Sequence, residues 1–103
     1  MKDRKRFTVK AVRWFDKVNG NTYHSCRIIR HKDGKEIVSS FCYGYGDSYR
    51  QSAMQEMIRN KWLPKKYRSN ETYYSYEREN SYPIIWLVTD GLKRECRENG
   101  NKL

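Results

Sequence analysis

The stretch from Ile37 to Leu63, which reads IVSSFCYGYGDSYRQSAMQEMIRNKWL, constrains the fold of this chain more than any other part of the sequence. Up to Tyr45 it alternates between two sets of side chains with a period of two, which is typical of a β-strand. Gly44 and Gly46 then permit backbone conformations that other residues avoid, so we expect a sharp corner there. The sequence therefore predicts a strand, a corner and a helix in direct succession.

The helix is predicted over Ser48–Leu63, because its apolar residues recur at helical spacing. They form two parallel rows, Tyr49, Ala53 and Met57 in one and Met54, Ile58 and Trp62 in the other. Asp47 and Ser48 offer side-chain oxygens to the first free amides, and Ser48 with Gln51 has the spacing of a capping box. Pro64 ends the helix because it disfavours helical geometry at the residue before it. A helix of about four turns with one apolar stripe must bury that stripe, and the preceding sheet is the available surface.

Length and composition limit the class of protein. A chain of 103 residues suffices for one domain, 1–103, with a single core of modest size. Only 37% of its residues are apolar, but 15% are aromatic, which favours a folded chain over a disordered one. The formal net charge of +10 predicts attraction to polyanions or to acidic proteins. No apolar run approaches the roughly 20 residues of a membrane span, and three cysteines without CxxC spacing favour reduced thiols in the cytoplasm.

Two further strands are expected before the central stretch, at Phe7–Phe15 and at Tyr23–His31, with a loop between them. Asp33-Gly34 is typical of a two-residue hairpin turn, which would pair Lys32 with Lys35. In this register Cys26 faces Phe41, and the more apolar face of the sheet receives the helix. That face carries His24, Cys26, Ile28, Arg30, Ile37, Phe41 and Tyr43. Cys42 falls on the opposite face from Cys26, so the two could not form a disulfide.

The last third of the chain is less regular. Lys65–Tyr82 is rich in tyrosine and has no clean period, so we expect a loop, with a short helical turn as an option. Its length is unusual for a structureless loop and indicates a functional or partner-ordered segment. Ile84–Val88 is a continuous apolar run, which predicts a fourth strand buried on both sides at an unspecified place in the sheet. Gly91–Asn99 is predicted to be a short helix, capped by Thr89 or Asp90, and its Leu92 and Cys96 should face inward.

The predicted fold is therefore α+β, in the order β-β-β-α-loop-β-α. A three- to four-stranded, mainly antiparallel sheet carries a long helix on one face, and a short helix ends the chain. Three antiparallel strands followed by a helix resemble the latter part of a double-stranded-RNA-binding domain that lacks its first helix. The resemblance implies recognition of duplex RNA by shape, with the loop Asp16–Asn21 in the minor groove. Where that family has a lysine cluster at the start of its last helix, this chain has only Arg50.

A second resemblance lies in the segments RWFDK, GNTYHS, YGYGDSYRQSA and DGLKRE. They are similar to segments of small uncharacterised proteins encoded by tailed bacteriophages and prophages, and the similarity extends from about Val9 to Arg97. It implies a setting, the cytoplasm of an infected host cell, and no particular activity. Phages use such small proteins for replication, for packaging, or to block host enzymes and immune systems.

Basic residues are the first group of candidate site residues. They can neutralise phosphates and thereby release counterions, which gives salt-dependent affinity for any sequence. The predicted contacts are Arg4, Lys5, Arg6, Arg13, Lys17, Arg27, Arg30, Arg50, Lys65, Lys66 and Arg68, of which the first three belong to a mobile basic arm, residues 1–6. The competing interpretation is a solvated surface that only keeps the protein soluble.

Tyrosines of the predicted loop are the second group, and they comprise Tyr67, Tyr73, Tyr74 and Tyr76. Exposed rings among cations are what the bases of a single strand stack on, at roughly 1–3 kcal/mol per base. The same composition suits a protein interface. The competing interpretation is that the loop folds back and its rings complete a small core.

Other candidates are weaker. His24 and Cys26 have the spacing of two metal ligands, but zinc needs three or four, so a buried histidine and a core thiol are favoured. Tyr43–Asp47 precedes a helix and could cradle a phosphate, although a structural turn is favoured. No nucleophile–base set or paired carboxylates are recognisable. We therefore expect no catalytic activity, no metal and no cofactor.

The sequence thus favours a non-catalytic nucleic-acid-binding protein, with DNA and RNA left open. The alternative is a phage inhibitor or adaptor that binds a host protein or ribonucleoprotein, for example an anti-defence or anti-CRISPR protein. No membrane partner is expected. A homodimer is a further option, because a strand at the sheet edge or the aromatic segment could pair with its copy.

Overall fold

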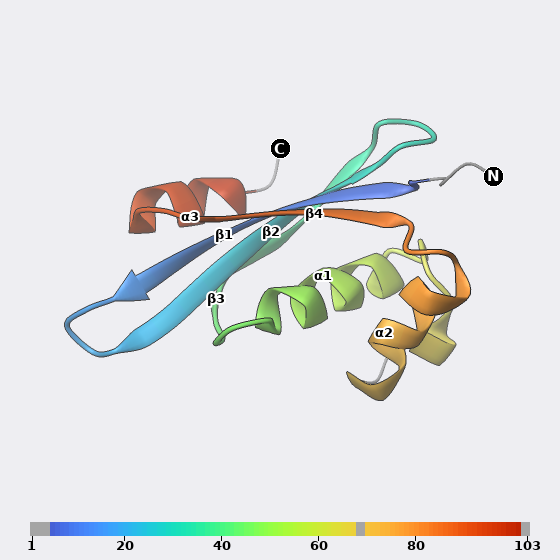
Figure 1. Cartoon of the computed structure of the whole chain (residues 1–103). Coiled ribbons are helices and arrows are strands. Elements are labelled where there is room, and N and C mark those ends of the chain that lie inside the picture. Colours follow the sequence, from blue (N-terminus) through green and yellow to red (C-terminus); the bar gives the residue numbers. More distant parts are fainter. Residues whose placement is uncertain (1–4, 68–69, 102–103) are drawn as a thin grey trace.

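The structure, a computed structural model, describes residues 5–67 and 70–101, without the side chains of residues 70–74. Its elements are β1 (Phe7–Asp16), β2 (Asn21–Arg30), β3 (Glu36–Tyr43), α1 (Ser48–Arg59), the 3-10 helix η1 (Lys65–Tyr67), α2 (Asn70–Glu79), β4 (Ile84–Asp90) and α3 (Lys93–Asn99). One sheet lies between two helical layers, with α1 and α2 on one face and α3 on the other (Figure 1). The predicted α+β class is confirmed.

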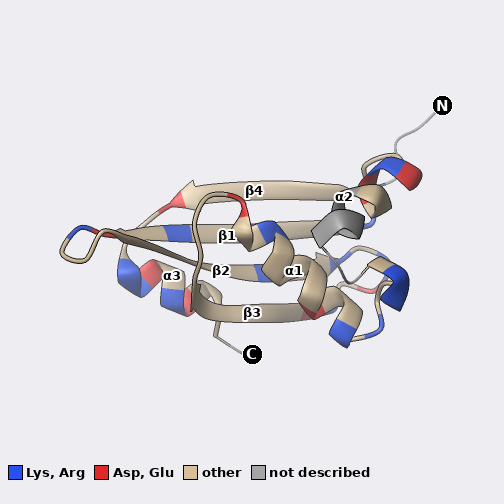
Figure 2. Cartoon of the chain, turned by 90° about the horizontal axis from the view of Figure 1, so that it is seen from below, with Lys and Arg blue, Asp and Glu red and all other residues tan. Residues whose placement is uncertain are grey.

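The sheet has four strands in the order β3-β2-β1-β4. The two pairs β1–β2 and β2–β3 are antiparallel, whereas β4 runs parallel to β1. The predicted fourth strand therefore exists, and it forms one border of the sheet (Figure 2). Its predicted burial on both sides is wrong. The side chain of Leu87 is 48% exposed, because the helix on that face, α3, packs on β1, β2 and β3 and leaves β4 open.

The core lies between the sheet and the helical layer that contains α1, where buried side chains from both layers meet. Its members are Phe7, Val9, Ala11, Cys26, Ile28, Tyr49, Ala53, Met54, Met57, Leu63, Tyr67, Tyr76 and Ile84. The sheet contributes alternate residues of its strands, and α1 contributes its predicted apolar stripe. The prediction that the helix packs on the face that carries Cys26 and Ile28 is confirmed.

The register of β2 and β3 differs from the expected one. Cys26 pairs with Ser39 and not with Phe41, because the turn is longer than two residues: β2 ends at Arg30 and β3 begins at Glu36. A β-bulge follows: between the pairs Cys26–Ser39 and His24–Cys42, β3 has one residue more than β2. A bulge inserts one extra residue and so reverses the faces that follow it.

The reversal has two consequences for the faces of the sheet. Cys42, expected away from α1, lies beside His24 under that helix, with 3.2 Å between Sγ and Nε2. Phe41 and Tyr43, expected under α1, lie on the opposite face, where both contact Tyr23.

Helix α1 is shorter than predicted. It ends at Arg59 because Lys61 has a positive φ of 63°, and the amide of Trp62 donates to the carbonyl of Met57 at 2.8 Å. Trp62 still contributes to the apolar stripe, since its ring stacks on that of Phe7 at 5.9 Å. At the other end Asp47 is the N-cap residue, but its side chain makes no capping hydrogen bond.

The segment Lys65–Tyr82, predicted to be a loop, contains η1 and α2. Tyr67 and Tyr76 are 6% and 3% exposed, and their rings pack edge to face at 5.2 Å. The Tyr67 hydroxyl donates to a carboxylate oxygen of Glu79 at 2.6 Å. For these two residues the alternative interpretation was correct: the segment folds back and completes the core. The side chains of Tyr73 and Tyr74 lie outside the described residues.

Helix α3 begins at Lys93, where Glu95 accepts a hydrogen bond from the amide of Leu92 at 2.7 Å, so neither Thr89 nor Asp90 caps it. Cys96 is fully buried as predicted, whereas Leu92 is 59% exposed. A Cβ atom on Gly100 would lie 3.0 Å from the amide nitrogen of Phe41. Glycine is therefore required for the close approach that brings the end of α3 against the sheet.

The α1–sheet contact generates a first prediction. The side chain of Met57 is 0% exposed, so Met57→Ala should lower the free energy of unfolding by about 2–5 kcal/mol, measured by urea denaturation. Gln55→Ala on the exposed face of the same helix is the matched control and should change it by less than about 0.5 kcal/mol. Equal effects of the two substitutions would contradict the described packing.

Candidate anion-binding site

Six basic side chains surround one hollow of about 570 Å³ at the end of the molecule where α1 finishes. Its lining consists of Lys5, Arg6, Arg30, His31, Lys32 and Lys61 together with Phe7, Trp62 and Tyr76. Among the described residues no Asp or Glu lines it. We call this hollow the basic pocket. Figure 2 shows basic residues at this end of the molecule and a second group at the opposite end, on α3 and the β1–β2 turn.

Lys5 and Arg6 enter the pocket from the segment before β1. The amide of Arg6 donates to the carbonyl of Pro83 at 2.7 Å, and its guanidinium donates to Oδ1 of Asn80 at 3.2 Å. The ammonium of Lys5 donates to the carbonyl of Tyr82 at 2.9 Å. These two residues of the predicted basic arm are thus hydrogen-bonded to the α2–β4 connection. Arg4, from the same predicted arm, lies outside the described residues.

Arg30 is held between an acid and a ring. Its guanidinium donates to both carboxylate oxygens of Asp33, at 3.1 and 2.6 Å, and lies 4.5 Å from the centre of the Trp62 ring. The hydrogen bond from Arg30 is the main cause that lowers the pKa of Asp33 to about 2. The same bond raises the pKa of Arg30. Arg30 is therefore a fixed, partly neutralised cation at the wall of the basic pocket.

His31 joins the ends of β1 and β2 beside these cations. Its Nδ1 donates to the carbonyl of Lys5 at 2.9 Å, and its Nε2 lies 2.8 Å from the hydroxyl of Thr8. Its amide donates to the carbonyl of Arg6 at 2.8 Å. These bonds fix the backbone that carries Lys5 and Arg6, so the pocket is formed by strand ends and not by long loops.

Lys65 and Lys66 follow the pocket along the chain, in η1. The ammonium of Lys66 lies 5.0 Å from the centre of the Tyr67 ring, and Tyr67 packs on Tyr76, which lines the pocket. This pair therefore extends the basic surface. Arg68, predicted to belong to the same cluster, lies outside the described residues.

The remaining predicted cations do not join this surface. Arg13 pairs with Asp90 at 3.0 Å, Arg27 with Glu36 at 2.9 Å and Arg50 with Glu77 at 3.1 Å. Lys17 lies in the β1–β2 turn, at the opposite end of the sheet. Of the predicted set, Lys5, Arg6 and Arg30 thus line one pocket, and Lys65 and Lys66 lie outside its lining, in η1. The structure also adds Lys32 and Lys61, which sequence reasoning missed because their proximity depends on how α1 ends.

The rings gather elsewhere than predicted. Because of the bulge in β3, five aromatic side chains form a row on the face that carries α3: Trp14, Tyr23, Phe41, Tyr43 and Tyr45. Tyr23 and Phe41 stack at 5.0 Å with nearly parallel planes, and Trp14 stacks on Tyr23 at 5.4 Å. We call this the ring row. Tyr43 and Tyr45 are 53% and 54% exposed.

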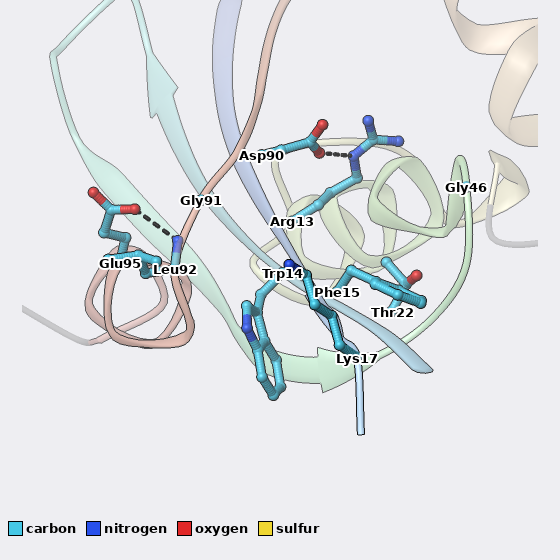
Figure 3. A pocket seen from close by; sticks show the side chains of 10 residues that line it. All are labelled: Arg13, Trp14, Phe15, Lys17, Thr22, Gly46, Asp90, Gly91, Leu92 and Glu95. Atoms are coloured by element: carbon cyan, nitrogen blue, oxygen red, sulfur yellow. Dashed lines mark hydrogen bonds and ion pairs between the residues drawn. The ribbon is translucent and has the colours of Figure 1, made fainter. Parts of the chain in front are cut away.

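A second hollow, of about 710 Å³, lies beside Trp14 at the start of the ring row (Figure 3). Both signs of charge line it, since Arg13 and Lys17 are accompanied by Asp90 and Glu95. Arg13 is paired with Asp90, and Glu95 is engaged by the backbone of α3. This mixture makes it a poorer site for a polyanion than the basic pocket.

A third group lies beneath α1. Nε2 of His24 is 2.7 Å from the Ser52 hydroxyl and 3.2 Å from Sγ of Cys42. Burial lowers the pKa of His24, so the ring is neutral at pH 7. Within the described ranges no three His, Cys, Asp or Glu residues are placed to hold a metal ion. The thiol of Cys26 donates to the carbonyl of Tyr49 at 3.3 Å, and burial raises its pKa.

No protein-family model, curated protein sequence or solved structure matches this chain. The described part of the chain contains no helix of the length and apolar character needed to cross a bilayer.

The buried His24 generates a prediction about pH. Its folded-state pKa lies below the ordinary value of 6.5, so the unfolded chain binds the proton more tightly. The free energy of unfolding should therefore fall as the pH falls below about 6.5, by at most about 1.4 kcal/mol per pH unit. Urea denaturation between pH 7.5 and pH 5 would measure this fall, and His24→Gln should reduce it.

An imidazole NMR titration gives an independent measurement on the intact protein. The chain has two histidines, and the signal lost in His24→Gln assigns His24. A titration midpoint for His24 at or above 6.5 would contradict the buried, neutral ring.

Proposed function

We propose that this protein is a non-catalytic nucleic-acid-binding protein that holds phosphate groups at its basic pocket. The observation that carries the proposal is the lining of that pocket: five Lys or Arg side chains and His31, with no carboxylate among the described residues that line it. Like charges so close together repel one another, and a bound polyanion relieves that repulsion. The setting is the one that the phage resemblance implies, the cytoplasm of an infected cell.

The cations of the pocket differ in what they contribute. Lys32 and Lys61 are exposed, and each can approach a phosphate as a point charge on a flexible stem, whereas the exposed ammonium of Lys5 is hydrogen-bonded to the carbonyl of Tyr82. Arg6 is anchored by Asn80, and Arg30 by Asp33, so these two fix the position of the ligand more than they add net charge. Recognition of this kind follows the backbone and does not read the bases.

The buried tyrosines limit the mode of binding. Tyr67 and Tyr76 are inaccessible to bases, and the face of Trp62 is already occupied by Arg30 and Phe7. Stacking of bases in this pocket is therefore excluded for these rings. The proposal accordingly rests on phosphate contacts alone, with Lys65 and Lys66 extending the path of the backbone past the pocket.

The ring row favours a second candidate function, binding to a host protein. The rings of Trp14 and Phe41 already stack on Tyr23, so the face of Tyr23 is less available to a base. Exposed tyrosines are common anchors of protein interfaces. In this alternative the protein is an inhibitor or adaptor, and Tyr43 and Tyr45 make the contact.

Salt dependence tests the first function. Fluorescence anisotropy with labelled DNA and RNA oligonucleotides should show log affinity falling linearly with log salt, with a slope of about −0.9 per phosphate neutralised on duplex DNA. Lys32→Glu with Lys61→Glu should weaken binding at least tenfold for every sequence. Lys65→Glu with Lys66→Glu should weaken it less, and again equally for all sequences.

The matched control is Lys17→Glu with Lys93→Glu, which changes the net charge by the same amount in the β1–β2 turn and at the start of α3, outside the basic pocket. It should reduce the affinity far less than the pocket variant. Equal losses would show that only net charge matters, and a flat salt dependence would overturn nucleic-acid binding. If Tyr43→Ala abolishes capture of one host protein while oligonucleotides fail to bind, the second function is correct.

A further inference from the structure

The outer edge of β4 carries unpaired backbone groups. The parallel ladder with β1 runs from the amide of Phe7, which donates to Pro83, to the amide of Gly91, which donates to Arg13. In a parallel pair, alternate residues of each strand direct both backbone groups to the same neighbour. Ile85, Leu87 and Thr89 therefore bond to β1. The N–H and C=O groups of Ile84, Trp86, Val88 and Asp90 point outward from the sheet.

This edge lacks the features that usually protect an exposed strand. Ile84–Asp90 reads IIWLVTD and contains no Lys, no Arg, no Pro and no bulge. Within the described part of the chain, β1 is the only element that packs extensively along it. Leu87, in the middle of the strand, is 48% exposed. A flat apolar edge of this kind is a template for another strand.

We propose that a second copy of this chain covers the edge, by antiparallel pairing of the two β4 strands about a two-fold axis at Leu87. Antiparallel pairing joins residues whose backbone groups both point outward, and this register satisfies that condition at every position. Trp86 pairs with Val88 of the second copy, and Ile84 pairs with Asp90 of the second copy. The two exposed Leu87 side chains then meet at the axis, and the two sheets become one continuous sheet.

The charges at the two ends of β4 fit this arrangement. At one end Asp90 points to the α1 face, where Arg13 binds its Oδ1 atom. At the other end, on the same face, exposed Arg78 lines a hollow beside Ile84 and Trp86. Because the pairing is antiparallel, Asp90 of each copy comes next to Arg78 of the other. The antiparallel arrangement thus places a basic side chain of one copy near an acidic side chain of the other at both ends of β4.

The surface is separate from the basic pocket, which opens on the other side of β1 near Arg30 and Lys61. The dimer therefore does not depend on the proposed function. It is also small, because edge pairing of one strand buries less than a standard interface. We expect a dimer that forms reversibly at micromolar concentrations and above.

Sedimentation velocity on the full chain, from about 1 µM to about 1 mM, is the decisive measurement. The mass should rise from 12.5 kDa toward twice that value as the concentration increases. Leu87→Lys places like charges at the axis and should weaken the association at least tenfold. Val18→Lys is the matched control, since Val18 is 91% exposed in the β1–β2 turn, and it should leave the association unchanged.

A charge swap distinguishes the proposed register from a general effect of destabilisation. Asp90→Arg and Arg78→Asp should each weaken the dimer, and the double variant should restore it. Circular dichroism checks that every variant is folded. A protein that stays at 12.5 kDa at all concentrations overturns the proposal. So does association that Leu87→Lys leaves intact, or a charge swap without rescue, either of which would assign the contact to another surface.

Discussion

The contact between α1 and the sheet is the interaction on which the rest of the structure depends. Ala53, Met54 and Met57 lie against Cys26 and Ile28, and all five are almost inaccessible to solvent. A chain in which only 37% of the residues are apolar has few other means of excluding water. Because α1 must lie across β2 and β3, its C-terminal end meets the ends of β1 and β2. That meeting forms the basic pocket.

The distribution of positive charge over the surface depends on which Lys and Arg side chains form ion pairs with carboxylates, and not on where these residues stand in the sequence. Arg13, Arg27 and Arg50 each lie next to a carboxylate, and of these carboxylates Asp90 is exposed whereas Glu77 is buried. The cations that remain near one another are those of Lys5, Lys32 and Lys61. Backbone hydrogen bonds at the strand ends hold the segments that carry Lys5 and Lys32 beside the pocket. The place where cations gather is more informative about function than the total charge.

The aromatic residues illustrate how one local irregularity changes a whole face. A single bulge in β3 moves Phe41 from the face that α1 covers to the face where Tyr23 and Trp14 lie. The same bulge brings Cys42 to His24. The ring row and the buried polar group beneath α1 are therefore two results of one inserted residue. Neither follows from the spacing of the residues, since a bulge leaves no reliable mark in a sequence with a continuous alternating pattern.

The sequence by itself determined the α+β class, the first three strands, the amphipathic stripe of α1 and the net charge, because each depends on local periodicity or composition. Only the tertiary structure decided the place of β4, the burial of Tyr67 and Tyr76, and the grouping of Lys32 and Lys61 with Lys5. These features depend on contacts between residues far apart in the chain. In particular, a tyrosine is buried only where another element of the fold packs against its ring. The sequence around the tyrosine does not show whether such an element is present.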